Sequence, residues 1–336
     1  MAMGNNELPL NLQEVNKTTG EVVKLDVNSA STVQPVALMR LGLFVPTLKS
    51  TSRSKTNRKN VTDATEELVQ LSIARSEGYT DVRITGSRLD MDTDFKVWLG
   101  IIRSMYDFGV KGDTLKLSFV EFVKMCGFDS RRSNKKMRDR ISNSLFKLAS
   151  VTLKFQSEMK GWTTHLVQSA YYDITADVVE IKAEPKLFEL YQMDRRVLLR
   201  LKAIDALQRK ESAQALYTYI ESLPQNPAPI SMKRMRDRLN LTSNVYTQNH
   251  TVRKAMTQLK DIGYLDYTEF KRGRATYFSV HYRNPKLISR KVIVPREQEE
   301  EAPEQNYDEV IKALKAAGID PQKLAKVLAS VKPDND

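Results

Sequence analysis

The chain contains an internal repeat, and this repeat limits the possible folds more than any other feature. Residues 114–155 and 228–270 share one order: an extended segment that ends in a serine, a brief helix, a polar turn and a longer helix. The two serines, Ser118 and Ser231, are of the residue type that caps helix N-termini. A supersecondary unit that occurs twice predicts two related domains in tandem rather than one larger domain.

Two helices are predicted in each copy, because apolar residues recur at the spacing of a helix that buries one face. In the first copy the apolar stripes are Phe119, Phe122 and Val123, then Met137, Ile141, Leu145 and Leu148. In the second copy they are Met232, Met235 and Leu239, then Val252, Met256, Leu259 and Ile262.

A β-hairpin is predicted after the longer helix of each copy. The strands are VTLKFQSE at 151–158 with WTTHLVQSAYYDI at 162–174, and YLDYTEF at 264–270 with ATYFSVHYR at 275–283. Gly273, in the KRGR between the last two, suits a tight turn. Strand, helix, turn, helix and hairpin make up a winged helix. We therefore expect an α+β chain with two tandem winged-helix domains, each with a β-hairpin wing.

Polar segments flank the two predicted domains. We expect a flexible N-terminal arm with a basic linker (1–62), a first winged-helix domain (63–200), a second one (201–290), an acidic linker (291–306) and a short helical C-terminal tail (307–336). Within the arm, the apolar stretch TVQPVALMRLGLFVP at 32–46 could dock onto the body. The basic stretch KSTSRSKTNRKN at 49–60 is either a solvated linker or a flexible arm that follows phosphates.

The chain carries a formal net charge of +12, which favours an anionic partner. Membrane is the weaker candidate, because no apolar run approaches the roughly 20 residues of a membrane span and the N-terminus does not resemble a secretion signal. Cys126 is the single cysteine, so no internal disulfide can form and a reducing cytoplasm fits. Nucleic acid is the predicted partner, with no membrane contact.

No motif predicts a catalytic or metal site. A phosphate-binding loop requires Gly-Lys, and the chain has no such pair. His165, His250, His281 and Cys126 lie far apart in sequence, which argues against a metal site and against a rolling-circle nicking enzyme. We expect no cofactor, no metal and no small-molecule substrate.

The acidic stretch Asp90-Met-Asp-Thr-Asp94 has the composition of a site for a hard cation. However, the strongly helical FKVWLGIIRSMYDFG follows it directly, and Asp or Thr is the usual cap at a helix start. We predict a cap that also interacts favourably with the helix dipole.

Another short pattern suggests an enzyme. His250-Thr-Val-Arg253, with Tyr282 downstream, matches part of the tyrosine-recombinase site, although we find no second arginine motif upstream. A DNA strand-transfer enzyme that uses His250, Arg253 and Tyr282 therefore remains an alternative. The position of the pattern on the second helix of the repeat favours DNA reading.

The second copy carries three groups of residues suited to DNA. With Val252, Met256 and Leu259 inward, the outer part of the longer helix presents Gln248, Asn249, His250, Arg253, Lys254, Thr257 and Gln258 for base contacts. The wing presents Lys271, Arg272 and Arg274. The shorter helix, which crosses the DNA backbone in this motif, presents Lys233, Arg234, Arg236 and Arg238. A solvated helical face is the alternative, but it does not explain why three basic groups meet in one motif.

The first copy is predicted to bind DNA through Arg131, Arg132, Ser133, Asn134, Lys135, Lys136 and Arg138. Asp139 and Phe146 also fall on the outward face of its longer helix, and an acid there disfavours deep groove reading. We expect this domain to contact phosphates more than bases and to support self-association.

Several long segments resemble one known family: TVQPVALMRLG at 32–42, ITGSRLDMDTDFKVW at 84–98, THLVQSAYYD at 164–173, ESAQALYTYIESLPQNPAPIS at 211–231 and IGYLDYTE at 262–269. The chain resembles the iteron-binding initiators of theta-replicating plasmids, the RepFIB-type RepA proteins, over roughly residues 30–290. The resemblance implies two winged-helix domains in a plasmid-encoded, cytoplasmic bacterial protein, with Gln248–Lys260 and Lys271–Arg274 as the main reader.

The resemblance also implies a set of partners. These are double-stranded DNA at the iterons of a plasmid origin and at the chain's own promoter, a second copy of the chain, and the host initiator, helicase and chaperones. We therefore expect an initiator that binds the repeated sites at the origin, promotes origin opening, recruits host replication proteins and represses its own promoter. A transcription regulator with no part in replication is the alternative of the same shape.

Overall fold

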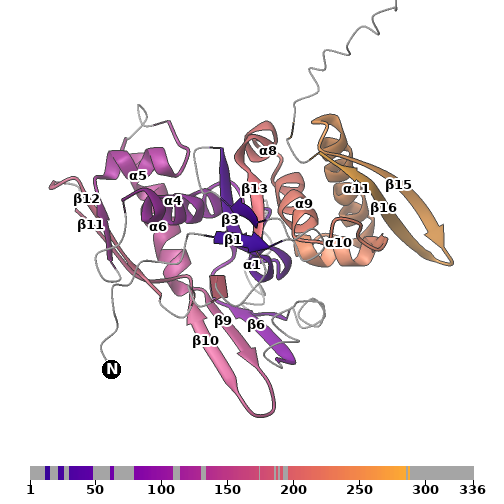
Figure 1. Ribbon diagram of the computed structural model, residues 1–336, viewed down its shortest axis with the longest axis horizontal. Coiled ribbons are helices and arrows are strands. Elements are labelled where there is room, and N and C mark those ends of the chain that lie inside the picture. Colours follow the sequence, from indigo (N-terminus) through magenta and orange to yellow (C-terminus); the bar gives the residue numbers. More distant parts are fainter. Residues whose placement is uncertain are drawn as a thin grey trace, which may run out of the picture. The chain divides into compact units, whose positions relative to one another are not determined.

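The structure is a computed structural model in which helices and small sheets alternate along the chain (Figure 1). It describes residues 30–47, 79–108, 114–129, 134–173, 175–184 and 196–284, the positions 187, 190, 191 and 287, and the backbone of the strands at 12–15, 22–25 and 61–63. The predicted acidic linker and C-terminal tail lie outside the described residues.

Both copies of the repeat contain the predicted elements, each preceded by a further helix, but in the first copy two more strands at 152–165 lie between the longer helix and the final hairpin. The first copy consists of α4 (Asp94–Phe108), β8 (Thr114–Leu117), α5 (Phe119–Met125), α6 (Lys135–Ser150), β11 (Val167–Asp173) and β12 (Val178–Ala183). The second consists of α9 (Glu211–Glu221), β14 (Ile230–Ser231), α10 (Met232–Leu239), α11 (Val245–Asp261), β15 (Leu265–Arg272) and β16 (Ala275–Arg283) (Figure 1).

The repeat extends to the residues that begin the helices. Ser118 and Ser231 cap the shorter helices α5 and α10, as predicted, and each hydroxyl accepts a hydrogen bond from the backbone N–H three residues further on. Asn134 and Asn244 cap the longer helices α6 and α11 in the same way. Each cap satisfies a backbone donor that has no partner within its helix.

The two copies also share a strand arrangement. In the second copy β14 pairs with β16, which pairs with β15. In the first copy β8 pairs with β12, which pairs with β11. The hairpin β11–β12 of the first copy is therefore the equivalent of β15–β16.

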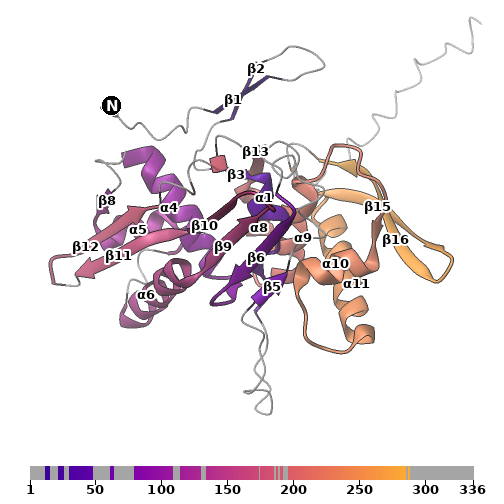
Figure 2. The ribbon, with the colours of Figure 1, turned by 90° about the horizontal axis from the view of Figure 1, so that it is seen from below.

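The predicted hairpin of 151–158 with 162–174 is confirmed in its first part, but it is not the wing of the first copy and does not extend to residue 174. The segment folds instead as a separate hairpin of β9 (Thr152–Gln156) and β10 (Gly161–His165), followed by β11. Strand β9 also pairs with β6 (Asp81–Thr85), which pairs with β5 (Val61–Asp63), so the extra hairpin belongs to a second sheet (Figure 2). Leu153 and Phe155 of β9 are completely buried in the core, which stabilises this pairing.

The segment 31–46 is part of the core. It forms β3 (Ser31–Pro35), α1 (Val36–Arg40) and β4 (Phe44–Val45), and its residues are buried except Gly42. Strand β3 pairs with β13 (Arg196–Arg200), and β4 pairs in parallel with β7 (Leu89–Asp90). The docking prediction is confirmed, and the prediction of a flexible arm is wrong for this segment.

One hydrophobic core contains residues of the N-terminal segment and of both copies. Gln34 of β3 shows how they are tied: its Oε1 accepts hydrogen bonds from Trp98 Nε1 of α4 at 2.9 Å and from the Tyr191 hydroxyl at 3.0 Å. All three side chains are buried. The predicted domain boundaries at 62, 200 and 290 stay predictions.

Candidate nucleic-acid interface

Helix α11 has one buried and one exposed face. Val252, Ala255, Met256 and Leu259 are buried, and the helix packs against α9 and α10. The exposed residues include His250, Arg253, Lys254 and Thr257 of the predicted reading face. Asn249 and Gln258 are half-buried at its edges. Major grooves admit a helix of this kind, and these side chains carry the donors and acceptors that base edges require.

Gln248 is used within the motif. Its Nε2 donates hydrogen bonds to the carbonyl oxygen of Leu241 at 3.1 Å and to that of Ser243 at 2.6 Å. Both acceptors lie in the turn between α10 and α11. The Gln248 amide group therefore fixes the turn, and the predicted base contact is not available to that nitrogen.

Arg238 corrects a prediction of DNA-backbone contact. Its side chain is buried, at 4% relative exposure. The guanidinium donates hydrogen bonds to the carbonyl oxygens of Met39 and Phe44, each at 3.0 Å, and to Thr218 Oγ1 at 3.2 Å. Arg238 therefore joins α10 to the N-terminal segment and to α9, and it cannot reach a phosphate in the folded chain.

The other basic residues of α10 lie nearer the surface. Lys233 is exposed and forms an ion pair with Asp237 one turn along the helix. Arg234 lies over the ring of Tyr219, with 5.5 Å between its guanidinium carbon and the ring centroid. Arg236 is half-buried, and its Nη1 donates to Asn249 Oδ1 at 3.4 Å.

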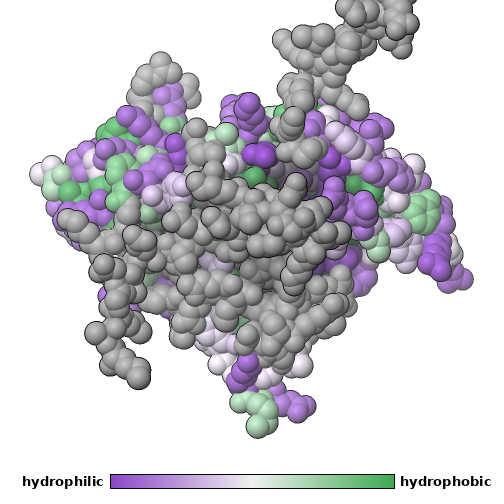
Figure 3. All heavy atoms as spheres, viewed as in Figure 1, coloured by the Kyte–Doolittle hydropathy of each residue, from purple (hydrophilic) through white to green (hydrophobic). Residues whose placement is uncertain are grey.

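The wing β15–β16 ends in a tight turn that carries the predicted cations. Arg272 pairs with Ala275, which leaves a two-residue loop, and Gly273 takes a positive φ of 62° at its first position. Lys271, Arg272 and Arg274 are all exposed. Hydrophilic side chains cover this tip of the hairpin, at the right of the view (Figure 3).

Two of the cations on α11 pair with acids on β15. Arg253 pairs with Glu269, with 2.7 Å between Nη2 and Oε1. Lys260 pairs with Asp266, with 3.2 Å between Nζ and Oδ1. The hydrogen bond from Arg253 to the Glu269 carboxylate raises the pKa of the Arg253 guanidinium. The two ion pairs connect α11 to the first strand of the wing.

Among the described residues, the first copy offers fewer cations to a ligand than the second copy. Arg131, Arg132 and Ser133 lie outside the described residues, and Asn134 serves as the cap of α6. Lys135 and Lys136 are exposed in the first turn of the helix. The half-buried Arg138 lies 4.8 Å from the centroid of the Phe119 ring, which places its guanidinium against α5.

The acidic stretch at 90–94 supports the predicted cap. Asp90 Oδ1 accepts hydrogen bonds from the backbone N–H of Thr93 at 2.6 Å and of Asp94 at 3.2 Å, where α4 begins. Lys147 of α6 binds both carboxylates, with Nζ–O distances of 3.1 Å to Asp90 and 2.7 Å to Asp94. Burial and the charge of Asp90 raise the pKa of Asp94 to about 6, against the opposing effect of the Lys147 ammonium group. Arg140 of α6 contacts Asp92 and Thr93.

Comparison with known proteins places the chain in a family. Residues 83–221 match the family model described as Initiator Replication protein, WH1. RepFIB replication protein A of Salmonella typhi is 58% identical over 277 residues, which cover 81% of this chain and 85% of that protein. The chain belongs to this family of plasmid replication initiators. The predicted family and function are thereby confirmed: the initiator binds origin DNA and is not an enzyme.

A second relative agrees with this assignment. Replication protein RepA of Salmonella typhi is 57% identical to the initiator over 293 residues, covering 87% of the chain and 83% of that protein. A crystal structure of domains 2 and 3 of RctB aligns with 74% of the initiator and 98% of that chain, at 12% identity and a TM-score of 0.46.

The recombinase alternative is wrong for this initiator. The family assignment contradicts it, and the guanidinium of Arg253 is held by a carboxylate. In the described residues, no three His, Cys, Asp or Glu side chains come together as candidate metal ligands. None of the described helices combines the length and apolar character of a membrane crossing. Burial raises the pKa of the Cys126 thiol, which disfavours the reactive thiolate.

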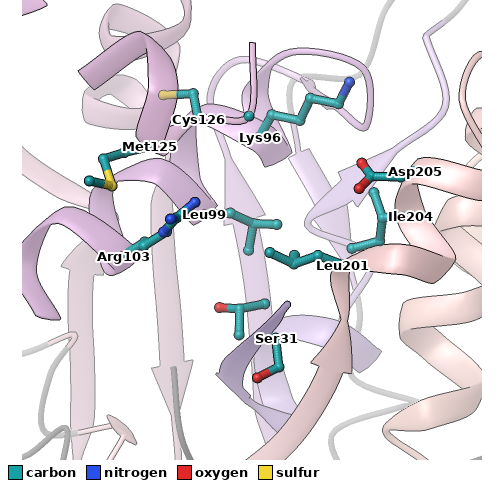
Figure 4. Close-up of a pocket in the computed structure, with 11 residues that line it drawn as sticks. Ser31, Lys96, Leu99, Arg103, Met125, Cys126, Leu201, Ile204 and Asp205 are labelled. Atoms are coloured by element: carbon teal, nitrogen blue, oxygen red, sulfur yellow. The ribbon is translucent and has the colours of Figure 1, made fainter. Parts of the chain in front are cut away.

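A small cavity lies between α4 and α8 (Leu201–Ala206). It has a volume of about 130 Å³, and its lining includes Lys96 and Leu99 of α4 and Leu201, Ile204 and Asp205 of α8 (Figure 4). Pockets for drug-sized molecules are typically about 300–1,000 Å³. The cavity is therefore too small to suggest a ligand.

Two features of the predicted reading surface were not expected from the sequence. Val245 and Tyr246 are exposed in the first turn of α11, and Tyr246 has 84% relative exposure. Tyr246 lies four residues before His250, on the same helical stripe, so the spacing could have indicated it. Glu269 could not be found in this way, because its partner Arg253 lies on another element.

Proposed function

We propose that the initiator recognises iterons at its plasmid origin through two tandem winged helices, of which the second reads the bases. The observation that carries this proposal is the exposed row His250, Arg253, Lys254 and Thr257 on α11, beside a wing whose tip is basic. Arg253 and Lys254 suit guanine, and Asn249 and Gln258 suit adenine.

Phosphate contacts would come from the elements around α11. Lys233, Arg234 and Arg236 lie on α10, the helix that crosses the DNA backbone in this motif. Lys271, Arg272 and Arg274 lie at the wing tip and are exposed. Such contacts set affinity and register, while the contacts from α11 set sequence preference.

The first copy has a different part in this proposal. Exposed Lys135 and Lys136, together with Arg131, Arg132 and Ser133, bind the backbone of the same site, and the domain supports pairing of two chains. Occupancy of several neighbouring iterons bends or opens the origin, because each bound copy adds its own binding energy to the deformed DNA. The same reader binds the chain's own promoter and represses it.

We further propose that the initiator acts in the bacterial cytoplasm. There it brings the host initiator and helicase to the opened origin, and chaperones convert its dimers to monomers. These partners are suggested by the family to which the chain belongs.

A plasmid test measures the proposed function directly. The gene and its flanking DNA are placed on a circle without another origin, and transformants are counted. We expect replication with the native gene and loss of replication with Lys254→Ala, while Lys260→Ala at the far end of α11 retains it. A chain that protects repeats in a footprint but never sustains the circle is a transcription regulator only.

A further inference from the structure

We propose that Glu269 is a positioning residue: its carboxylate fixes the Arg253 guanidinium so that Arg253 reads one guanine in the iteron. This inference rests on the proposed function of α11 as the base reader. Glu269 itself is not expected to touch a base.

Glu269 binds the Arg253 guanidinium along one edge only, the edge formed by Nε and Nη2. Arg253 Nε lies 2.9 Å from Oε1 and 3.1 Å from Oε2 of Glu269, and Arg253 Nη2 lies 2.7 Å from Oε1. Both carboxylate oxygens are thus used by one edge of the guanidinium. Among the described residues, none accepts a hydrogen bond from Nη1.

The free edge of this guanidinium matches the major-groove edge of guanine. A guanidinium has five N–H donors in one plane, and the Nε side is occupied by Glu269. The donors that remain belong to Nη1 and to the second hydrogen of Nη2. Two parallel donors of this kind bind O6 and N7 of guanine. Because one edge is already held, little side-chain freedom remains to be lost when the other edge binds.

The charge of Glu269 requires an explanation of this sort. A carboxylate on a surface that faces phosphates opposes binding. Arg253 and Glu269 are 47% and 32% exposed, and ion pairs that exposed contribute little to fold stability. A role in orienting the reader accounts for an acid at a place where neither binding nor stability favours one.

A second pair between the same two elements provides a control. Asp266 lies on the same strand as Glu269 and pairs with Lys260, near the C-terminal end of α11. Removing Asp266 also deletes one acid from β15 and one contact between helix and wing. It leaves the ion pair between Arg253 and Glu269 intact.

The test uses the full-length protein as wild type and as E269A, R253A, R253A/E269A and D266A. Binding is measured on a duplex of the native repeat, on its complete set of single-base-pair variants, and on random duplex of equal length at one salt concentration. Circular dichroism melting confirms that each variant is folded.

We expect E269A to lower the ratio of specific to random binding roughly five- to tenfold, the lower end for one bidentate base contact. Its preference should relax at the same base pair as that of R253A. In the R253A background, E269A should leave the ratio unchanged, because Glu269 acts through Arg253. D266A should leave the ratio at its wild-type value.

Other results overturn the inference. If E269A relaxes a base pair that R253A leaves intact, Glu269 reads a base itself. If E269A tightens binding to both DNAs by the same factor, Glu269 acts only as a charge. If D266A lowers the ratio as E269A does, the wing as a whole is displaced. If R253A itself leaves the ratio unchanged, the proposed reading by α11 fails as well, and this result separates the two failures.

Discussion

Helices α6 and α11 occupy equivalent places in the two copies, yet they use their cations differently. When the buried stripes are aligned, with Ile141 matched to Val252, Asp139 and Phe146 stand where α11 has His250 and Thr257. Phe146 is 72% exposed. The outward face of α6 thus carries an acid and an aromatic ring at positions where α11 carries groups suited to base edges.

Three basic residues of α6 are held by contacts with neighbouring elements of the fold. Arg140 and Lys147 contact the acidic loop before α4, and Arg138 lies against the ring of Phe119. In α11, by contrast, Arg253 and Lys254 are exposed. The position of the basic residues around the helix therefore decides whether they are anchored to the fold, as in α6, or exposed, as in the proposed reading helix α11.

The two wings also differ in the charge of the residues at their turns. The turn of β15–β16 is flanked by Arg272 and Arg274, whereas β11–β12 has Asp173 and Asp177 next to its turn. Asp173 accepts hydrogen bonds from the backbone N–H groups of Thr175 and Ala176, which lower its pKa and keep it charged. A charged acid repels phosphates, so we expect the wing of the first copy to stay off the DNA backbone.

The largest expected effect tests the anchored helix. Lys147→Met leaves the buried Asp94 without its cation, and we expect the free energy of unfolding to fall by about 3 kcal/mol, the lower end for breaking a buried pair. Urea unfolding followed by circular dichroism measures it. Gln258→Met, at the matching place on α11, should change stability by less than about 0.5 kcal/mol. Equal stabilities for the two variants would remove the distinction between the helices.

The next effect tests the reading helix. Arg253→Ala and Lys254→Ala should each weaken binding to the native repeat by about 1–3 kcal/mol, because each removes a contact to a base edge. Binding to random DNA of equal length should change much less. Fluorescence anisotropy on both duplexes measures the two losses. Equal losses on both would make α11 a clamp on the backbone, like the first copy.

A smaller effect tests the wing tip. Arg272→Ala and Arg274→Ala should each reduce the slope of log affinity against log salt by about one unit, because each removes one phosphate contact. The order of preference among repeat variants should not change. Titrations at several salt concentrations give the slope. An unaltered slope together with a changed preference would instead assign the wing to base readout.

The smallest effect concerns Asp139. Asp139→Asn removes one negative charge from the outward face of α6, so every DNA should bind slightly more tightly and by the same factor. The comparison is made on the native repeat, its single-base variants and random duplex. A loss confined to one base pair would show that Asp139 accepts a hydrogen bond from cytosine, and then both copies read bases.

Local patterns were sufficient for much of this fold. Ser118 and Ser231 marked the starts of two helices, the apolar stripes marked their buried faces, and Gly273 marked the turn of the second wing. Each of these features depends on neighbours within a few residues. The exposed row on α11 followed from the same periodicity.

Features that depend on distant partners were not predictable. The alternation in β9 is the same for a wing strand as for a strand that pairs with β6, so only the fold distinguishes them. Arg238 has the sequence context of a surface cation, but its acceptors are Met39 and Phe44, far upstream. Gln248 has its acceptors in the turn before α11, and Glu269 of β15 has its partner Arg253 on α11, so neither contact follows from the periodicity of a single element.

The pairing of β3 with β13 has a consequence for synthesis of the protein. Strand β3 leaves the ribosome early, whereas β13 follows much later. Val33 of β3 pairs with Leu198 of β13, and this distance along the chain takes roughly 10–30 s at about 5–20 residues per second. During that interval the apolar segment 31–46 lacks the partner strand that covers it in the finished fold. Arg238 then requires this segment as well, since its acceptors lie there. The hydrogen bonds of Arg238 therefore tie the second copy to the N-terminal segment, and this contact is complete only when both parts of the chain are in place.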